Sequence, residues 1–177
     1  MSPIRRTRWR VITGAPCSGK TAVIEELARR GHPVVPETAR AYIDRELARG
    51  RCLEEIKADP SAFEGHIFRT KLALEGRLPA EEPFFLDRGL PDSIAYFTLE
   101  GLDPEEPRAR CRQVRYHRVF LFERIEFLKD PVRSEDSETA ARIERLIEEA
   151  YAGLGYPLVR VPVMAIAERA AYVLARG

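Results

Sequence analysis

The chain has 177 residues, 45% of them hydrophobic, enough for one substantial core, so we expect a single domain over residues 1–177. The 29 lysines and arginines nearly balance the 28 aspartates and glutamates, so no bulk charge favours a nucleic acid or an acidic membrane as partner. No apolar run approaches about 18 residues and the N-terminus lacks a hydrophobic signal core, so we expect a cytoplasmic protein. Its 3 cysteines lack metal-ligand spacing, which indicates free thiols.

Apolar segments alternate along the chain as a wound α/β sheet requires. Short strands are expected at residues 9–13, 32–36, 83–86, 118–122 and 158–161. Helices are expected from residue 22, over 38–48, from a Ser61 cap to 76, from 91, over 137–151 and over 165–175. The predicted fold class is α/β, with a five-stranded parallel sheet, helices on both faces and a ligand crevice outside the carboxyl ends of the strands.

Two arginine-rich segments flank these elements. Near the N-terminus, arginines are expected to form a solvated leader, with a basic arm as the alternative: Arg5, Arg6, Arg8 and Arg10. A second group is typical of a basic helix surface, with a substrate role as the alternative: Arg108, Arg110, Arg112 and Arg115.

A complete phosphate-binding loop, G-x-x-x-x-G-K-[ST], follows the first strand and opens the first helix. Its glycines allow successive N–H groups to point at phosphate oxygens, and the helix N-terminus favours the same anion. The Lys20 ammonium can reach the outer phosphates, and the Thr21 hydroxyl can ligate Mg²⁺. We therefore expect ATP or GTP, with Mg²⁺, to bind at Gly14, Ala15, Pro16, Cys17, Ser18, Gly19, Lys20 and Thr21.

Asp87 and Arg88 directly follow the apolar strand 83–86, so they should emerge beside the loop. A carboxylate there suits Mg²⁺, either as a direct ligand or through water, and the alternative is an aspartate that caps the next turn. Arg88 would clamp an anionic or hydroxyl-bearing substrate, with a surface ion pair as the alternative. Gly89 is expected to allow the tight turn.

Glu37 ends the second strand, with Arg40 one helical turn further on. A carboxylate near the γ-phosphate could accept a proton from an attacking hydroxyl, whereas the alternative is a helix-start carboxylate that the dipole stabilises. The charged segment 123–135 could close over the phosphates, with Arg124, Lys129 or Arg133 neutralising transition-state charge. A solvated loop is the alternative there.

Residues 14–21, 35–40, 85–92 and 130–135, in this order, resemble the AAA-type P-loop ATPase and kinase domain family. That family includes NadR-like ribosylnicotinamide kinases and a eukaryotic regulatory GTPase branch. The Asp87-Arg88 pair also resembles thymidylate and deoxynucleoside kinases, in which the arginine contacts substrate and a glutamate after the second strand is the general base. The resemblance implies these roles for Arg88 and Glu37. Ribosylnicotinamide kinases have Asp-Thr-Asp where this chain has Asp87-Arg88-Gly89, so their substrate does not carry over.

The leading interpretation is an ATP- and Mg²⁺-dependent phosphotransferase acting on a small hydroxyl-bearing, nucleoside-like acceptor, with residues 48–78 forming the acceptor pocket. One alternative is an NTPase that uses water and acts as a regulatory switch. The chain contains no asparagine, which argues against guanine recognition through an Asn-Lys-x-Asp segment. Another alternative is a non-catalytic nucleotide sensor or partner-binding module. The sequence leaves the oligomeric state open.

Overall fold

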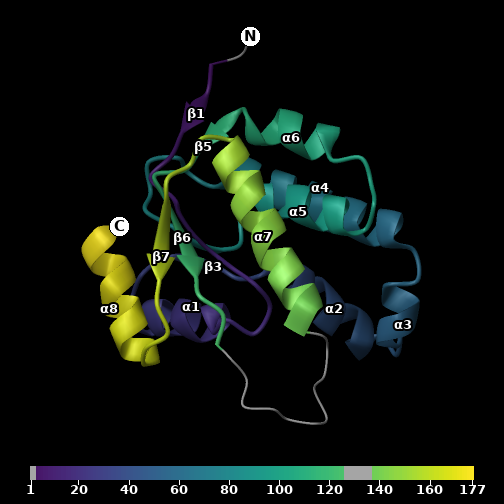
Figure 1. The fold of residues 1–177 in the computed structure, drawn as a ribbon, viewed down its shortest axis with the longest axis horizontal. Helices are drawn as coiled ribbons and strands as arrows, with labels where there is room; N and C mark the ends of the chain where they lie inside the picture. Colours follow the sequence, from purple (N-terminus) through teal and green to yellow (C-terminus); the bar gives the residue numbers. More distant parts are fainter. Residues whose placement is uncertain (1–2, 126–136) are drawn as a thin grey trace.

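A five-stranded parallel sheet lies at the centre of the protein (Figure 1), in a computed structural model that describes residues 3–125 and 137–177. From one edge to the other its strands are β3 (Val34–Val35), β4 (Phe85–Asp87), β2 (Arg10–Thr13), β6 (Arg118–Phe122) and β7 (Leu158–Val161). All neighbouring pairs are parallel. The predicted fold class and its five strands are therefore confirmed, and the strand that precedes the phosphate-binding loop is central.

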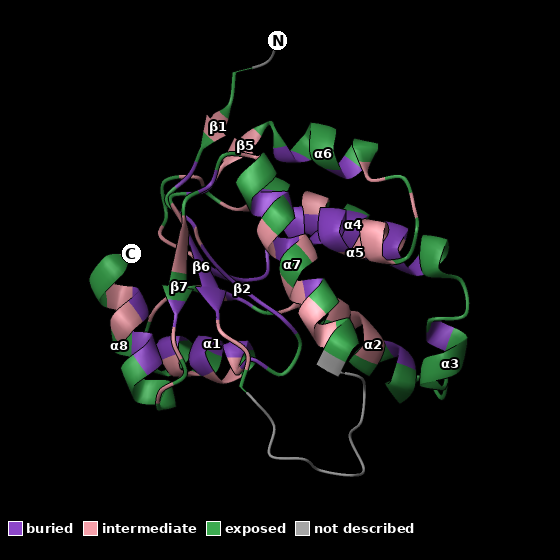
Figure 2. Ribbon diagram, viewed as in Figure 1, coloured by how far each residue is buried: buried purple, intermediate pink, exposed green. Residues whose placement is uncertain are grey.

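Helices cover both faces of this sheet (Figures 1 and 2). On one face lie α1 (Lys20–Arg29) and α8 (Ile166–Arg176); on the other lie α4 (Pro60–Arg77), α5 (Pro91–Leu99) and α7 (Ser137–Gly153). Successive strand residues serve opposite faces: Val119 and Leu121 join the cluster under α5 and α7, whereas Phe120 joins the one under α1 and α8. This is the pattern of a parallel sheet buried on both sides.

The α2 (Thr38–Ala48), α3 (Leu53–Ile56) and α6 (Glu105–Cys111) helices complete the described fold. The α2 and α3 helices pack against α4 through a small apolar cluster that includes Phe63 and Ile67. The α6 helix contacts α5. No helix in the described ranges is long and apolar enough to cross a membrane.

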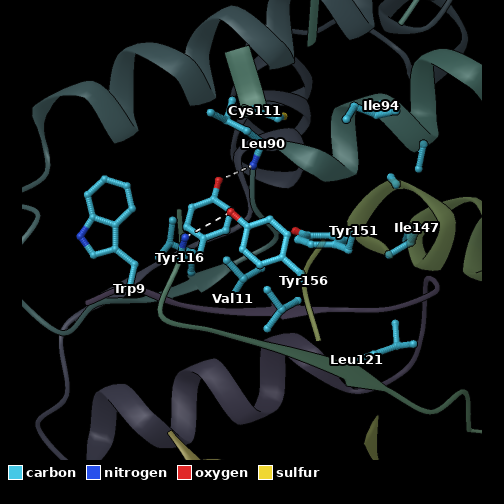
Figure 3. Close-up of a cluster of buried hydrophobic side chains, with 14 of the residues drawn as sticks. Trp9, Val11, Leu90, Ile94, Cys111, Tyr116, Leu121, Ile147, Tyr151 and Tyr156 are labelled. Atoms are coloured by element: carbon cyan, nitrogen blue, oxygen red, sulfur yellow. Dashed lines mark hydrogen bonds between the residues drawn. The ribbon is translucent and has the colours of Figure 1, made fainter. Parts of the chain in front are cut away.

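Aromatic side chains pack among aliphatic ones in the core on the α5 and α7 side (Figure 3). The rings of Tyr116 and Tyr156 stack with centroids 5.7 Å apart, and the Tyr156 hydroxyl donates to the carbonyl oxygen of Val114 at 3.1 Å. Tyr116 Oη accepts from Leu90 N and donates to Glu75 Oε2 at 2.8 Å, while Tyr151 Oη donates to Asp92 Oδ2 at 2.6 Å. Buried tyrosines with paired hydroxyls fix the geometry of this layer as well as filling it.

The predicted solvated leader is wrong. Residues Arg5–Arg6 form β1, which pairs in parallel with β5 (Val114–Arg115). The Arg5 guanidinium donates to the carbonyl oxygens of Glu75 and Leu78 and lies 4.9 Å from the centre of the Trp9 ring. A two-residue strand carries no hydrophobic period, so its pairing is invisible in the sequence.

Two local assignments also change. The side chain that caps α4 is Asp59, which accepts from Ala62 N at 2.9 Å; Ser61 lies inside the first turn. The expected basic helix surface divides between elements, because Arg115 belongs to β5 and donates to the carbonyl oxygens of Leu154 and Gly155.

The buried Glu75 carboxyl leads to a prediction about stability. Burial raises the pKa of Glu75 to about 7, although the Tyr116 hydroxyl bond favours the ionised form. The folded state therefore holds this proton more tightly than the unfolded chain, and the stabilisation is present at low pH and lost as pH rises through about 7. As the pH rises, the free energy of unfolding should therefore decrease by about 3 kcal/mol less in Glu75→Gln than in the unaltered protein.

Urea unfolding at about pH 5 and about pH 8 measures the effect. Glu82→Gln, at an exposed position, is the matched control. Burial also raises the pKa of Glu64 to about 7, so the variant should keep the part of the pH dependence that Glu64 supplies. An identical loss of stability in the unaltered protein and in Glu75→Gln would contradict the assignment.

Candidate active site

The predicted phosphate-binding loop lies between β2 and α1, at the carboxyl end of the central strand. Gly14 has φ +143°, and a Cβ there would lie 2.6 Å from the carbonyl oxygen of Phe122. Gly19 (φ +82°) and Cys17 (φ 60°) also have left-handed backbone, and α1 begins at Lys20. The glycines are thus required both by conformation and by the close approach of β6.

The Lys20 ammonium lies inside this loop. Its Nζ donates to the carbonyl oxygen of Ala15 at 2.7 Å and to Ser18 Oγ at 3.1 Å. Burial lowers the pKa of Lys20 to about 7, and the positive charge of Arg88 contributes in the same direction. A polyphosphate in the loop would favour the charged ammonium and reverse this shift.

Nucleotide binding should therefore take up protons. Above about pH 7 the buried Lys20 is partly neutral, so binding of ATP at about pH 8 is expected to add part of a proton to it. Titration calorimetry in buffers of different ionisation enthalpy measures the uptake. Lys20→Arg, whose charge is permanent, should bind without uptake, and Lys20→Ala should bind at least about tenfold more weakly. Unchanged affinity of a folded Lys20→Ala variant would contradict the role of the loop.

Thr21 and Asp87 come together as predicted for a metal site. Thr21 Oγ1 donates to Asp87 Oδ2 at 3.2 Å, and among the described residues the buried Asp87 Oδ1 has no hydrogen-bond partner. Hydroxyl and carboxylate oxygens are donors that Mg²⁺ prefers, and an orphaned carboxylate oxygen leaves room for a ligand. The described part of the chain holds no group of three or more His, Cys, Asp or Glu that could form a protein-only cage. The residues therefore fit a Mg²⁺ ion whose other ligands are phosphate oxygens and water.

Asp87 does not cap the following helix. The residue before α5 is Leu90, and it is Asp92 Oδ2 that accepts from Gly89 N at 2.9 Å. Burial raises the pKa of Asp87 to about 6, and the negative charge of Glu37 adds to the shift. Protons would therefore compete with any metal ion for this carboxylate in mildly acidic solution.

Arg88 is neither exposed nor part of a surface ion pair. Its guanidinium is buried: Nε donates to Glu37 Oε1 at 2.9 Å, and Nη1 donates to the carbonyl oxygen of Gly14 at 3.0 Å and to Asp92 Oδ1 at 2.9 Å. Arg88 also has the left-handed backbone of this turn, with φ 68°. The expectation that Gly89 supplies the turn is therefore wrong. A glycine is needed there because a Cβ would lie 2.9 Å from Tyr151 Oη.

Asp92 is the residue around which Arg88, Thr13 and Tyr151 form a buried hydrogen-bond network. It was not singled out from the sequence. It is fully buried and accepts from Thr13 Oγ1 and Tyr151 Oη, each at 2.6 Å, in addition to Arg88. Burial disfavours its charge, but Arg88, Lys71 and the two hydroxyls outweigh burial and keep the pKa of Asp92 below its ordinary value. The available signal was the i, i+4 spacing of Arg88 and Asp92 within an apolar segment, since a buried charge requires a partner.

Glu37 precedes α2, but its side chain makes no capping hydrogen bond to that helix. Its carboxylate is bound to Arg88 instead, and its side chain is 25% exposed. The structure thus joins three of the predicted residues, Glu37, Arg88 and Asp87, beside the loop through hydrogen bonds and charge.

Arg40 is not part of this group, because it is exposed and pairs with Asp44. Arg133 and Lys129 lie outside the described residues, as does most of the proposed lid.

A second buried arginine, Arg169, binds the backbone of the phosphate loop from α8. Arg169, in α8, donates from Nη1 to the carbonyl oxygen of Ser18, from Nε to that of Pro162 and from Nη2 to that of Glu123. Its guanidinium lies 5.0 Å from the centre of the Phe122 ring. Arg169 therefore ties the loop to the carboxyl ends of β6 and β7, a role that the sequence did not indicate.

Two charged side chains of α4, those of Glu64 and Lys71, lie near the turn that carries Arg88. Lys71 Nζ donates to the carbonyl oxygen of Gly89 at 3.1 Å. Glu64 is buried, and the charges that act on it include those of Lys71 and Arg88. The Tyr96 ring, from α5, lies 5.4 Å from the Arg88 guanidinium carbon. The segment expected to build the acceptor pocket thus brings titratable groups toward the network.

A phosphate-binding loop after the central strand of a parallel sheet defines a P-loop domain. The family model for the AAA domain matches residues 9–169, and the chain belongs to this family. The predicted family is confirmed. Among curated proteins, none matches the chain significantly.

Solved structures of other proteins share the fold. The NadR protein in complex with NR superposes with a TM-score of 0.72 at 17% identity, over 96% of this chain and 50% of that chain. Thymidylate kinase from Ehrlichia chaffeensis gives 0.66 at 12% identity, over 97% of this chain and 98% of that one. Deoxyadenosine kinase from M. mycoides gives a TM-score of 0.62 at 11% identity, over 95% of this chain and 97% of that one. The chain thus spans half the length of NadR and nearly all of the two smaller kinases.

Proposed function

We propose that this protein is an ATP- and Mg²⁺-dependent phosphotransferase acting on a small hydroxyl-bearing, nucleoside-like acceptor. The observation that carries the proposal is the position of Glu37: its carboxylate is partly exposed and is held by Arg88, which also contacts Gly14 at the start of the phosphate loop. A carboxylate fixed beside the phosphates suits the removal of a proton from an attacking hydroxyl. The likeness in fold to nucleoside and nucleotide kinases supports the same class of reaction.

In the proposed reaction the acceptor oxygen forms a bond to the γ-phosphorus while the bond from that phosphorus to the β–γ bridging oxygen breaks. The nucleoside diphosphate leaves with the bridging electron pair, and the acceptor proton moves to Glu37. Lys20 and the loop amides hold the outer phosphates, and Arg88, fixed by Asp92, orients Glu37. Thr21 and Asp87 would hold Mg²⁺, which neutralises charge on the phosphate oxygens when bound.

The acceptor would meet the α4 and α5 side of the site. Tyr96 contributes an aromatic ring there, one face of which lies against Arg88, and Glu64 and Lys71 contribute polar groups. An aromatic face with a few convergent polar groups suits a nucleoside-like molecule, whose base stacks and whose ribose carries hydroxyls.

A metabolite panel incubated with ATP and Mg²⁺ tests the proposal, with nucleoside diphosphate release and product mass measured together. A new phosphorylated product would identify the kinase. Release of nucleoside diphosphate with only inorganic phosphate would identify an NTPase. If neither a phosphorylated product nor nucleoside diphosphate is formed, a nucleotide sensor is favoured. Repeating the panel with GTP determines the base preference.

A further inference from the structure

A group of cationic side chains lies at the amino ends of the sheet strands, opposite to the end that carries the phosphate loop. Arg10 begins β2 and Arg118 begins β6, and the two are register partners in neighbouring strands. In Figure 1 this end of the sheet faces β1 and β5. We call the group the basic cluster; it consists of Arg6, Arg8, Arg10, Arg115, His117 and Arg118.

The charge of the basic cluster is not compensated within the described part of the chain. Several arginines elsewhere pair with carboxylates, as Arg29 and Arg30 do with Glu26. No described residue forms an ion pair with an arginine of the cluster: Arg115 donates to backbone carbonyl oxygens, and Arg8 reaches only the carbonyl oxygen of Glu81. Burial and its neighbours Arg8 and Arg118 lower the pKa of Arg10, which shows that like charges act on each other here.

One donor of the basic cluster is buried without a partner. The Nε atom of Arg118 has no hydrogen-bond acceptor among the described residues. A buried donor left unpaired is unfavourable, and most such atoms in folded proteins find a protein or ligand partner.

Arg118 is also one of the residues that line a cavity of about 310 Å³. Its lining includes Arg6, Arg115, His117 and Arg118 together with Thr7 and Tyr156, and no Asp or Glu of the described ranges is among the lining residues. The Arg115 guanidinium lies 4.1 Å from the centre of the Tyr156 ring, which holds it in place at the cavity wall. The volume is at the lower end of the range of small-molecule sites.

We propose that this cavity binds a compact phosphate-bearing anion, of the size of pyrophosphate or a small phosphorylated metabolite, at a site distinct from the phosphate-binding loop. Guanidinium groups bind phosphate through paired N–H donors, and three arginines, Arg6, Arg115 and Arg118, line the cavity. The concave shape and the near-neutral net charge of +1 favour a compact anion over a nucleic acid, which requires an extended basic surface.

Titration calorimetry with inorganic pyrophosphate tests the proposal, in the Lys20→Ala background, in which the phosphate loop binds anions more weakly. We expect one pyrophosphate per chain, with an affinity that falls as NaCl is added. Arg118→Gln should weaken it at least about tenfold, and Arg118→Lys should weaken it less. Arg29→Gln, which makes the same charge change on the exposed side of α1, is the matched control and should leave binding unchanged.

Arg6→Gln, at an exposed position, gives a second variant that does not disturb the core, and thermal unfolding of each variant verifies folding. Three results would overturn the proposal. Binding that disappears with Lys20→Ala alone would place the anion only in the loop. Equal weakening by Arg29→Gln would indicate unspecific charge attraction. Tight binding of a single-stranded RNA oligonucleotide without pyrophosphate binding would make the surface a nucleic-acid site.

Discussion

Asp87→Asn is expected to lower the rate of phosphoryl transfer at least about a hundredfold and to weaken its dependence on Mg²⁺. The reason is the carboxylate itself: one oxygen meets Thr21 at 3.2 Å and the other is buried without a hydrogen-bond partner in the described structure. An amide has the same size, but it carries no charge and only one of its two terminal atoms can ligate a metal. Single-turnover transfer measured across a Mg²⁺ titration reports both the rate and the metal requirement.

The same variant should be at least as stable as the unaltered protein. Burial raises the pKa of Asp87 to about 6, so the ionised carboxylate is disfavoured by the fold and an amide is not. Loss of activity with an undiminished melting temperature therefore separates a functional role from unfolding. Asp44→Asn, at an exposed position of α2, is the matched control. A normal rate at the normal Mg²⁺ concentration in Asp87→Asn would contradict the metal role.

The pH dependence follows from the same pKa. Below about pH 6 a proton increasingly occupies Asp87, so the Mg²⁺ concentration needed for half-maximal rate should rise as the pH falls. In Asp87→Asn this part of the pH dependence should be absent.

The elements that the sequence revealed are those with a strong local signal. Strands buried on both faces read as apolar runs, so residues 118–122 identified β6 and residues 9–13 identified β2. The pairing of β1 with β5 joins residues that are far apart along the chain, and neither strand is long enough to show a period. Short strands of this kind are fixed by contacts such as those of Arg5 with Glu75 and Leu78, which no local pattern encodes.

The site shows the same division. Lys20 and Thr21 follow from a contiguous motif, and Asp87 follows from its place at the end of a strand. Asp92 and Arg169 were missed because the contacts that reveal them include remote partners: Thr13 lies 79 residues from Asp92, and Ser18 lies 151 residues from Arg169. The nearby Arg88 was a local signal for Asp92. Their type was not informative either, since most charged residues are exposed and only the folded chain shows which are enclosed.

The interpretation of Arg88 was limited by the same lack of context. The sequence predicted that Arg88 lies beside the loop. It did not predict the three partners that enclose the guanidinium, or the left-handed backbone of this residue. A non-glycine residue held in that conformation is strained, and such residues cluster at functional sites. In this chain the conformation lets one guanidinium reach Glu37, Gly14 and Asp92 at once.

Glu37→Gln should slow phosphoryl transfer to the acceptor by about 10²–10⁴-fold, the range for general-base catalysis, and toward the lower end because phosphoryl-transfer transition states are loose. The amide oxygen can still accept the hydrogen bond that Arg88 Nε now makes to Glu37 Oε1 at 2.9 Å, so the geometry should persist. Only the capacity to take a proton is removed. Affinity for the nucleotide should change little, because Lys20, Thr21 and Asp87 are untouched.

Glu46→Gln provides the control, because it makes the same change in α2 at a glutamate paired with Arg49 and Arg51 rather than with Arg88. Both variants lose an ion-paired carboxylate and should lose similar stability, whereas only Glu37→Gln should lose transfer. Single-turnover product formation and the urea unfolding midpoint are measured on each. If Glu37→Gln transfers at the normal rate in a slightly less stable protein, Glu37 serves only to hold Arg88. If it also hydrolyses ATP normally, the attacking group does not need this carboxylate, and the NTPase with water as its acceptor becomes the better account of the site.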